Sequence, residues 1–115
     1  MKKFLFLAFV CLTELAYSAP PDVNNPLTAV GVLRSSYCPK GTVWVQARVK
    51  EAVDDDAYTI EDSTGEILLF LPTDELAALP IKIGMRILVY GTVDISQVRP
   101  EKNELYAEKV ILFED

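Results

Sequence analysis

The chain has 115 residues, half of them hydrophobic, and its 17 acidic residues against 11 basic residues produce a formal net charge of −6. This length suits one small domain with a single core. The negative charge disfavours nucleic acids and anionic lipid surfaces, because both bind mainly through Lys and Arg. The chain contains no His, which excludes a Cys–His or Ser–His nucleophile.

The first eighteen residues have the layout of a secretory signal peptide. Lys2 and Lys3 are followed by an uninterrupted apolar run at 4–12 and by a small-residue site that ends at Ser18. The run is too short to cross a bilayer core of about 30 Å as a helix. We therefore expect export, cleavage after Ser18 and no stable membrane insertion afterwards. An uncleaved N-terminal anchor is the alternative.

Residues 19–40 are predicted to precede the folded domain, which we expect at 41–115. Three prolines within 19–26 indicate an extended tether. The segment 27–37 predicts a short helical or irregular lead-in that covers one end of the domain, with Thr28 as a candidate helix cap. Cys38 would be the single thiol of the mature chain. We expect it to be a partly buried small hydrophobe, and an intermolecular disulfide is the alternative.

The stretch 42–71 predicts three antiparallel strands joined by short turns at 54–56 and 62–65. Side chains alternate between two faces along each strand. The inward set is aliphatic apart from one tyrosine: Val43, Val45, Ala47, Val49, Tyr58, Ile60, Ile67, Leu69 and Leu71. The three aspartates at 54–56 suit a solvated turn better than a calcium loop, because they lack the spacing of one.

The remaining chain predicts a short helix and two further strands. Thr73 caps a helix that Pro80 stops. A strand follows at 83–94, in which Gly91 permits close backbone approach, and the last strand spans 104–113 with a bulge at 108–109. The fold is therefore predicted to be all-β, a five-stranded Greek-key barrel with one short helix between strands three and four. That arrangement is the oligonucleotide/oligosaccharide-binding (OB) fold.

Three motifs carry a resemblance to a known family. They are V-x-V-x-A-x-V at 43–49, the hairpin Asp55-Asp56-x-Tyr58-x-Ile60-x-Asp62-x-x-Gly65-x-Ile67, and Gly84-x-x-Ile87-x-Val89-x-Gly91-x-Val93-Asp94. Behind a signal peptide, they resemble the bacterial OB-fold family of small exported proteins. The resemblance implies a periplasmic envelope protein linked to stress tolerance. The chain departs from the family at Ala47, where Gly is usual, and in the position of its tryptophan.

The candidate ligand-binding residues occupy the outer face of the first three strands, which OB-folds use for binding. They are Trp44, Gln46, Arg48, Thr59, Glu61, Leu68 and Phe70. Exposed aromatic and aliphatic side chains beside Arg48 suit an envelope protein or a cell-wall oligosaccharide. In the alternative, the lead-in 27–37 folds back over Trp44, Leu68 and Phe70, and the face is a second small core.

Other functions have weaker support in the sequence. Single-stranded nucleic acid needs aromatics within a basic groove, whereas acidic residues surround these ones, so it remains the alternative ligand. No residue pattern indicates a catalytic centre, a metal site or a cofactor. We expect a non-enzymatic, monomeric binding protein.

Overall fold

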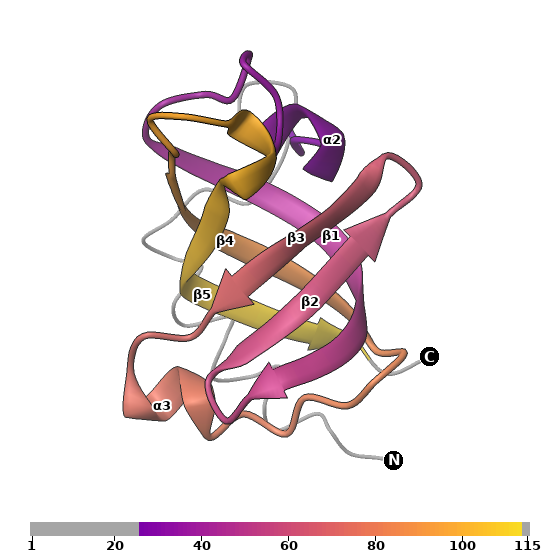
Figure 1. Ribbon diagram of the computed structural model, residues 1–115. Helices are drawn as coiled ribbons and strands as arrows, with labels where there is room; N and C mark the ends of the chain where they lie inside the picture. Colours follow the sequence, from indigo (N-terminus) through magenta and orange to yellow (C-terminus); the bar gives the residue numbers. More distant parts are fainter. Residues whose placement is uncertain (1–25, 114–115) are drawn as a thin grey trace.

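The computed structural model describes residues 26–113, so the expected signal peptide and its cleavage site lie outside the described residues. Five strands form one closed barrel in the order β1-β2-β3-β5-β4 (Figure 1). The strands are β1 (Thr42–Asp54), β2 (Ala57–Asp62), β3 (Gly65–Phe70), β4 (Arg86–Asp94) and β5 (Glu104–Phe113). The helical segments are α2 (Val30–Leu33), α3 (Asp74–Ala77) and the 3-10 turn η1 (Pro100–Lys102). This order confirms the predicted all-β Greek-key barrel with a helix between β3 and β4.

The barrel core is aliphatic and follows the alternation of the sequence. Of the inward residues predicted for the first three strands, all but Tyr58 are buried, and Tyr58 packs against the core while partly exposed. Burying one aliphatic side chain of this size contributes about 1.5–3 kcal/mol relative to leaving it exposed. Cys38 is half-buried against the same core, as expected for a small hydrophobe.

Strand β1 closes the barrel because it pairs with two neighbours along its length. From Thr42 to Arg48 it pairs with β4, and from Arg48 to Asp54 it pairs with β2. Register shifts in the second half mark bulges that bend the strand around the barrel. Outward side chains in the first half of β1 therefore lie beside β4, and those in the second half lie beside β2.

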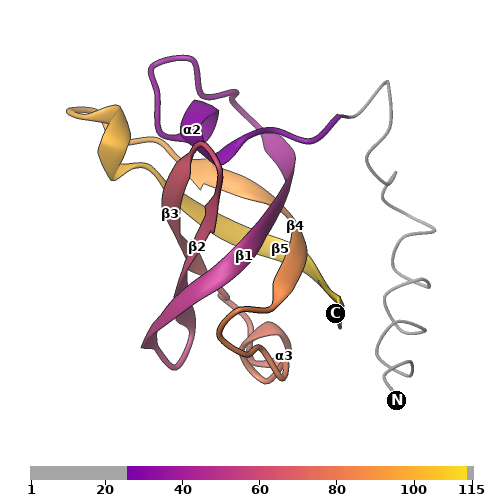
Figure 2. The same ribbon diagram turned by 90° about the vertical axis from the view of Figure 1, so that its right-hand side faces the viewer.

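The two ends of the barrel are covered by different helical segments (Figures 1 and 2). At one end lies α3, where the hydroxyl of Thr73 accepts a hydrogen bond from the Leu76 amide at 3.2 Å, which confirms the predicted cap. At the other end lie α2 and η1.

Strands β4 and β5 approach closely at one glycine. A Cβ atom on Gly91 would lie 2.3 Å from the carbonyl oxygen of Tyr106 on β5, so the backbones can meet only without a side chain there. Beside this contact the register shifts, and Glu108 has no Cα partner between Tyr90 and Gly91. The predicted bulge at 108–109 is confirmed.

The lead-in is part of the core, because Val30 and Leu33 are fully buried in the aliphatic cluster. The helix α2 is not capped by Thr28, which corrects that expectation. Its first amides are instead bound by the β2–β3 turn. The Val30 amide donates to Asp62 Oδ2 at 2.9 Å, and the Gly31 amide donates to Thr64 Oγ1 at 2.7 Å. A distant turn thus replaces the local cap.

Candidate ligand-binding face

The outer faces of β2 and β3 bring four of the seven predicted site residues together. Thr59 lies opposite Leu68 in the β2–β3 register, and Glu61 follows two residues later on β2. Phe70 lies two residues beyond Leu68, so its side chain shares that face. All four residues are partly exposed. The sequence alternation therefore places this part of the face correctly.

The β1 residues contribute less to that face than expected. Arg48 borders it, because its Cα partners are Glu61 on β2 and Arg86 on β4. Gln46 is exposed but lies opposite Leu88 on β4. The switch of partners along β1 therefore separates Gln46 from the β2–β3 face.

Trp44 does not present its ring to a ligand, which corrects the prediction. Its side chain is 0% exposed. Leu27 forms a parallel β-bridge with Trp44, and the Thr28 amide donates to the Trp44 carbonyl oxygen at 2.8 Å. The ring contacts Tyr90 on β4, with the ring centroids 4.8 Å apart. The alternative of a covered face therefore holds for Trp44, while the two apolar residues of β3 stay partly exposed.

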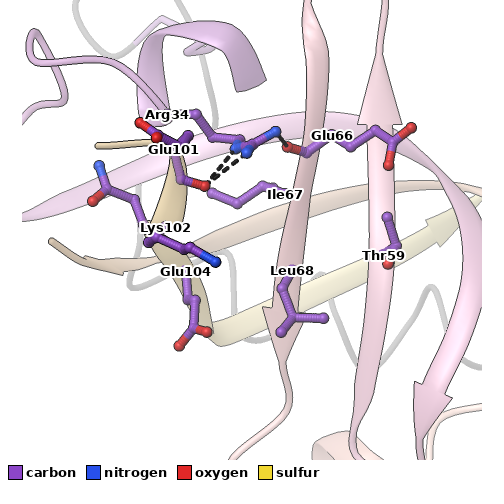
Figure 3. Close-up of a pocket in the computed structure, with 9 residues that line it drawn as sticks. Arg34, Thr59, Glu66, Ile67, Leu68, Glu101, Lys102 and Glu104 are labelled. Atoms are coloured by element: carbon purple, nitrogen blue, oxygen red, sulfur yellow. Dashed lines mark hydrogen bonds between the residues drawn. The ribbon is translucent and has the colours of Figure 1, made fainter. Parts of the chain in front are cut away.

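A hollow of about 240 Å³ lies next to Leu68 on this face (Figure 3). Two predicted residues, Thr59 and Leu68, line its strand side. The rest of the lining comes from the start of β3 and from two segments distant in sequence: Arg34, Glu66, Ile67, Glu101, Lys102, Asn103 and Glu104. The site is thus built from β2, β3, the residue that follows α2, and the η1–β5 segment.

Arg34 joins three of these elements at one end of the hollow (Figure 3). Its Nη1 donates to the Glu66 carbonyl oxygen at 3.0 Å. Its Nε and Nη2 donate to the Glu101 carbonyl oxygen at 3.1 and 2.7 Å. Both acceptors are backbone carbonyls, so the guanidinium holds α2 and η1 against β3 and is not paired with either glutamate side chain.

Asn103 fixes the neighbouring loop from inside. It is 3% exposed, and within residues 26–113 it is the one polar residue that is buried. Its Nδ2 donates to the Leu33 carbonyl oxygen at 2.7 Å, and its Oδ1 accepts from the Ser96 amide at 2.8 Å. The Asn103 side chain therefore supplies hydrogen-bond partners both to a carbonyl at the end of α2 and to an amide in the loop before η1.

An aromatic pair lies at the seam of β3 and β5, next to the hollow. The two strands run parallel there, with Leu68 opposite Glu104 and Phe70 opposite Tyr106. The rings of Phe70 and Tyr106 stack with centroids 5.0 Å apart and planes 18° apart. Desolvation raises the pKa of Tyr106, and the carboxylates of Glu104 and Asp94 raise it further. The aromatic pair therefore lies in a negative field.

The hollow itself has a mixed but acidic lining. Three glutamates at 66, 101 and 104 face the two cations Arg34 and Lys102. The Glu66 carboxylate forms an ion pair with Lys50 on β1. With that carboxylate paired, Glu101 and Glu104 offset Arg34 and Lys102, so the hollow lacks the excess of cations on which binding to a phosphate backbone depends.

The part of the chain that the structure describes holds no group of three or more His, Cys, Asp or Glu arranged for a metal ion. In the aspartate turn, Asp54 Oδ1 accepts from the Asp55 amide at 2.8 Å, a local turn bond. Within residues 26–113, no helix is long and apolar enough to cross a membrane.

The closed barrel, its strand order and the helix between β3 and β4 define an OB-fold protein. A scan against protein-family models and a search of curated proteins each find no match. Among solved structures, the chain is similar to the hypothetical protein YgiW from E. coli, with a TM-score of 0.63, 16% identity, and coverage of 84% of this chain and 99% of that chain.

Two further solved structures are similar to the chain and differ in what they bind. One is a replication protein A heterotrimer bound to ssDNA, with a TM-score of 0.53, 22% identity, and coverage of 69% of this chain and 62% of that chain. The other is OBody NL8 bound to hen egg-white lysozyme, with a TM-score of 0.54, 14% identity, and coverage of 65% and 96%. At these identities the similarities establish the fold.

Proposed function

We propose that this protein is an exported, non-enzymatic OB-fold binding protein of the bacterial envelope, which binds a partner protein on the outer face of β2, β3 and β5. One observation carries the proposal: a hollow lies beside a partly exposed aromatic pair on the face that OB-folds use for binding. The periplasmic location and a contribution to stress tolerance come from the resemblance to the bacterial OB-fold family.

The site differs from the face expected from sequence, because the seam of β3 and β5 takes the place of Trp44. Partly exposed Phe70 and Leu68 provide apolar contact area, and the surrounding polar groups can form hydrogen bonds that orient the ligand. The OBody–lysozyme structure supports a protein ligand in general terms, since it places an OB-fold on a protein surface. A cell-wall oligosaccharide stacked on the aromatic pair is the other ligand class.

The substitution Phe70→Asp tests the face. Substitution of a hot-spot residue typically weakens the free energy of binding by about 2 kcal/mol or more. We therefore expect the amount of partner protein captured to fall at least tenfold when a carboxylate replaces the Phe70 ring. The measurement is quantitative mass spectrometry of proteins cross-linked to the purified domain in envelope extract. Glu75→Asp, on exposed α3 at the far end of the barrel, is the control. Equal recovery by the wild type and Phe70→Asp would sink the assignment.

Single-stranded nucleic acid is the second candidate, and the similarity to replication protein A bound to ssDNA favours it. Against it stand the net charge of −6 and the acidic lining of the hollow. Fluorescence polarisation with a labelled oligonucleotide at low and high salt decides between the two. Because electrostatic attraction is strongest at low salt, absence of binding there removes this candidate.

A further inference from the structure

The exposed aromatic pair of β3 and β5 has the chemistry of a cation platform. Tyr106 is 36% exposed and stacks on Phe70. The face of an aromatic ring attracts a cation that lies within about 6 Å of its centroid, and the attraction grows when water is excluded. Stacking on Phe70 holds the Tyr106 ring in place, so the ring is pre-organised for such a contact.

Two carboxylates flank Tyr106 on the same outer face. Glu104 precedes it by two residues on β5, and Asp94 lies opposite Glu104 on β4. Among the described residues, neither carboxylate forms an ion pair with a Lys or Arg. Two adjacent negative groups repel each other, and a cation placed between them removes that repulsion.

We infer that this face recognises a Lys or Arg side chain carried by an extended segment of the partner protein, with the cation over the Tyr106 ring and between Glu104 and Asp94. The inference rests on the proposed binding function and names the chemistry of its ligand. The hollow continues from Glu104 along Leu68 to Thr59, so the next residues of the segment lie along a mixed polar and apolar surface. We call Tyr106, Glu104 and Asp94 the cation subsite.

The same groups argue against other occupants. A lipid headgroup or a nucleic acid would bring phosphates toward Glu104 and Asp94, which repel them. A divalent metal prefers several oxygen ligands and makes no use of an aromatic ring. A cationic side chain uses the ring and both carboxylates together.

Selection of random heptapeptides displayed on phage tests the cation subsite without assuming a partner. The bait is the purified chain of residues 19–115. The Phe70→Asp variant serves for counter-selection. Binding of the selected peptides is then compared between the wild type and the double variant Glu104→Gln/Asp94→Asn. These amide substitutions keep size and polarity, and the spectrum of backbone amides by NMR confirms that each variant is folded. Glu75→Gln on α3 is the control for loss of one carboxylate elsewhere on the surface.

The expected result is enrichment of peptides that contain Lys or Arg and need Phe70, with about tenfold weaker binding to the double variant and unchanged binding to Glu75→Gln. Amide shifts on titration should centre on Tyr106 and Leu68. Phe70-dependent peptides without a basic residue would overturn the cation subsite and leave the proposed function standing. No Phe70-dependent peptide at all would contradict both. Competition by free spermidine equal to that by the peptide would show recognition of a polyamine and overturn the inference.

Discussion

At Gly91 the fold leaves no room for a side chain. The backbone of β5 passes so close that a methyl group would lie 2.3 Å from the Tyr106 carbonyl oxygen. We expect Gly91→Ala to reduce the free energy of unfolding by about 1–3 kcal/mol or more, since an overpacked core must shift its backbone. Urea denaturation measures the change, and Thr92→Ala, on the exposed next position, is the control. Equal stability of the two variants would contradict the close approach.

Asp62 makes the capping of α2 dependent on pH. Partial burial raises its pKa, but hydrogen bonds from Thr64, Val30 and Gly65 outweigh burial and hold the pKa below the ordinary value of 3.8. A lowered folded-state pKa means that Asp62 contributes its full stabilisation above the unfolded pKa. That contribution is lost as the pH falls through the folded-state pKa.

The variant Asp62→Asn removes this titration and keeps an amide oxygen near the helix. At pH 6 we expect a loss of about 0.5–2 kcal/mol of stability, the range measured for helix caps. The difference between wild type and variant should narrow as the pH falls from 5 toward 2, because only the wild type has a carboxylate to protonate. Urea titrations across that range measure it, and a constant difference would contradict the role of ionised Asp62.

At the scale of elements, the lead-in is a structural part of the barrel. Leu33 is fully buried in the core cluster, whereas Val32 on the same helix is 39% exposed. We expect Leu33→Ala to cost about 2–5 kcal/mol, the usual range for buried leucine, and Val32→Ala to cost well under 1 kcal/mol. Chemical denaturation of both variants checks this. Similar losses would mean that α2 does not seal the barrel.

The strands could be predicted from sequence because their signals are local. Val43, Val45, Ala47 and Val49 recur at every second position of β1 and are buried, and in β3 the buried Ile67 and Leu69 alternate with less buried neighbours. The helix cap at Thr73 depends on local chemistry in the same way, and the glycine at 91 predicted a close backbone approach without naming β5 as the partner. Each of these predictions is confirmed.

The candidate site was predicted only in part because half of it depends on long-range contacts. Arg34 meets Glu101 across 67 residues, and Asn103 meets Leu33 across 70. Trp44 has the alternation of an outward residue, but Leu27 and Tyr90 cover it. Alternation fixes the direction of a side chain and cannot show what lies above it.

At the scale of the whole molecule, the OB-fold leaves the ligand open, and charge narrows it. The similar solved structures include an OB-fold protein bound to ssDNA and one bound to lysozyme. In this chain the seam beside the hollow carries Glu104 and Asp94, where a nucleic-acid groove would carry cations. The sign of these two side chains is therefore the basis on which we propose a protein ligand in preference to nucleic acid.

The proposed export can be tested on the full chain by following its processing. Expressed in E. coli with residues 1–18 intact, the protein is expected in the periplasmic fraction with the mass of residues 19–115. Leu7→Arg, which places a charge in the apolar run, should abolish processing. Intact-mass measurement of osmotic-shock and cytoplasmic fractions reads out both. Full-length wild-type protein in the cytoplasm would contradict export.

The capping of α2 by the β2–β3 turn also sets an order of events during folding. A helix of four residues is not stable on its own in water, and the groups that receive its first amides lie about 32 residues further along the chain. We therefore expect α2 to form only after the β2–β3 hairpin is in place. The segment that precedes the barrel in sequence would then be among the last to take its native shape.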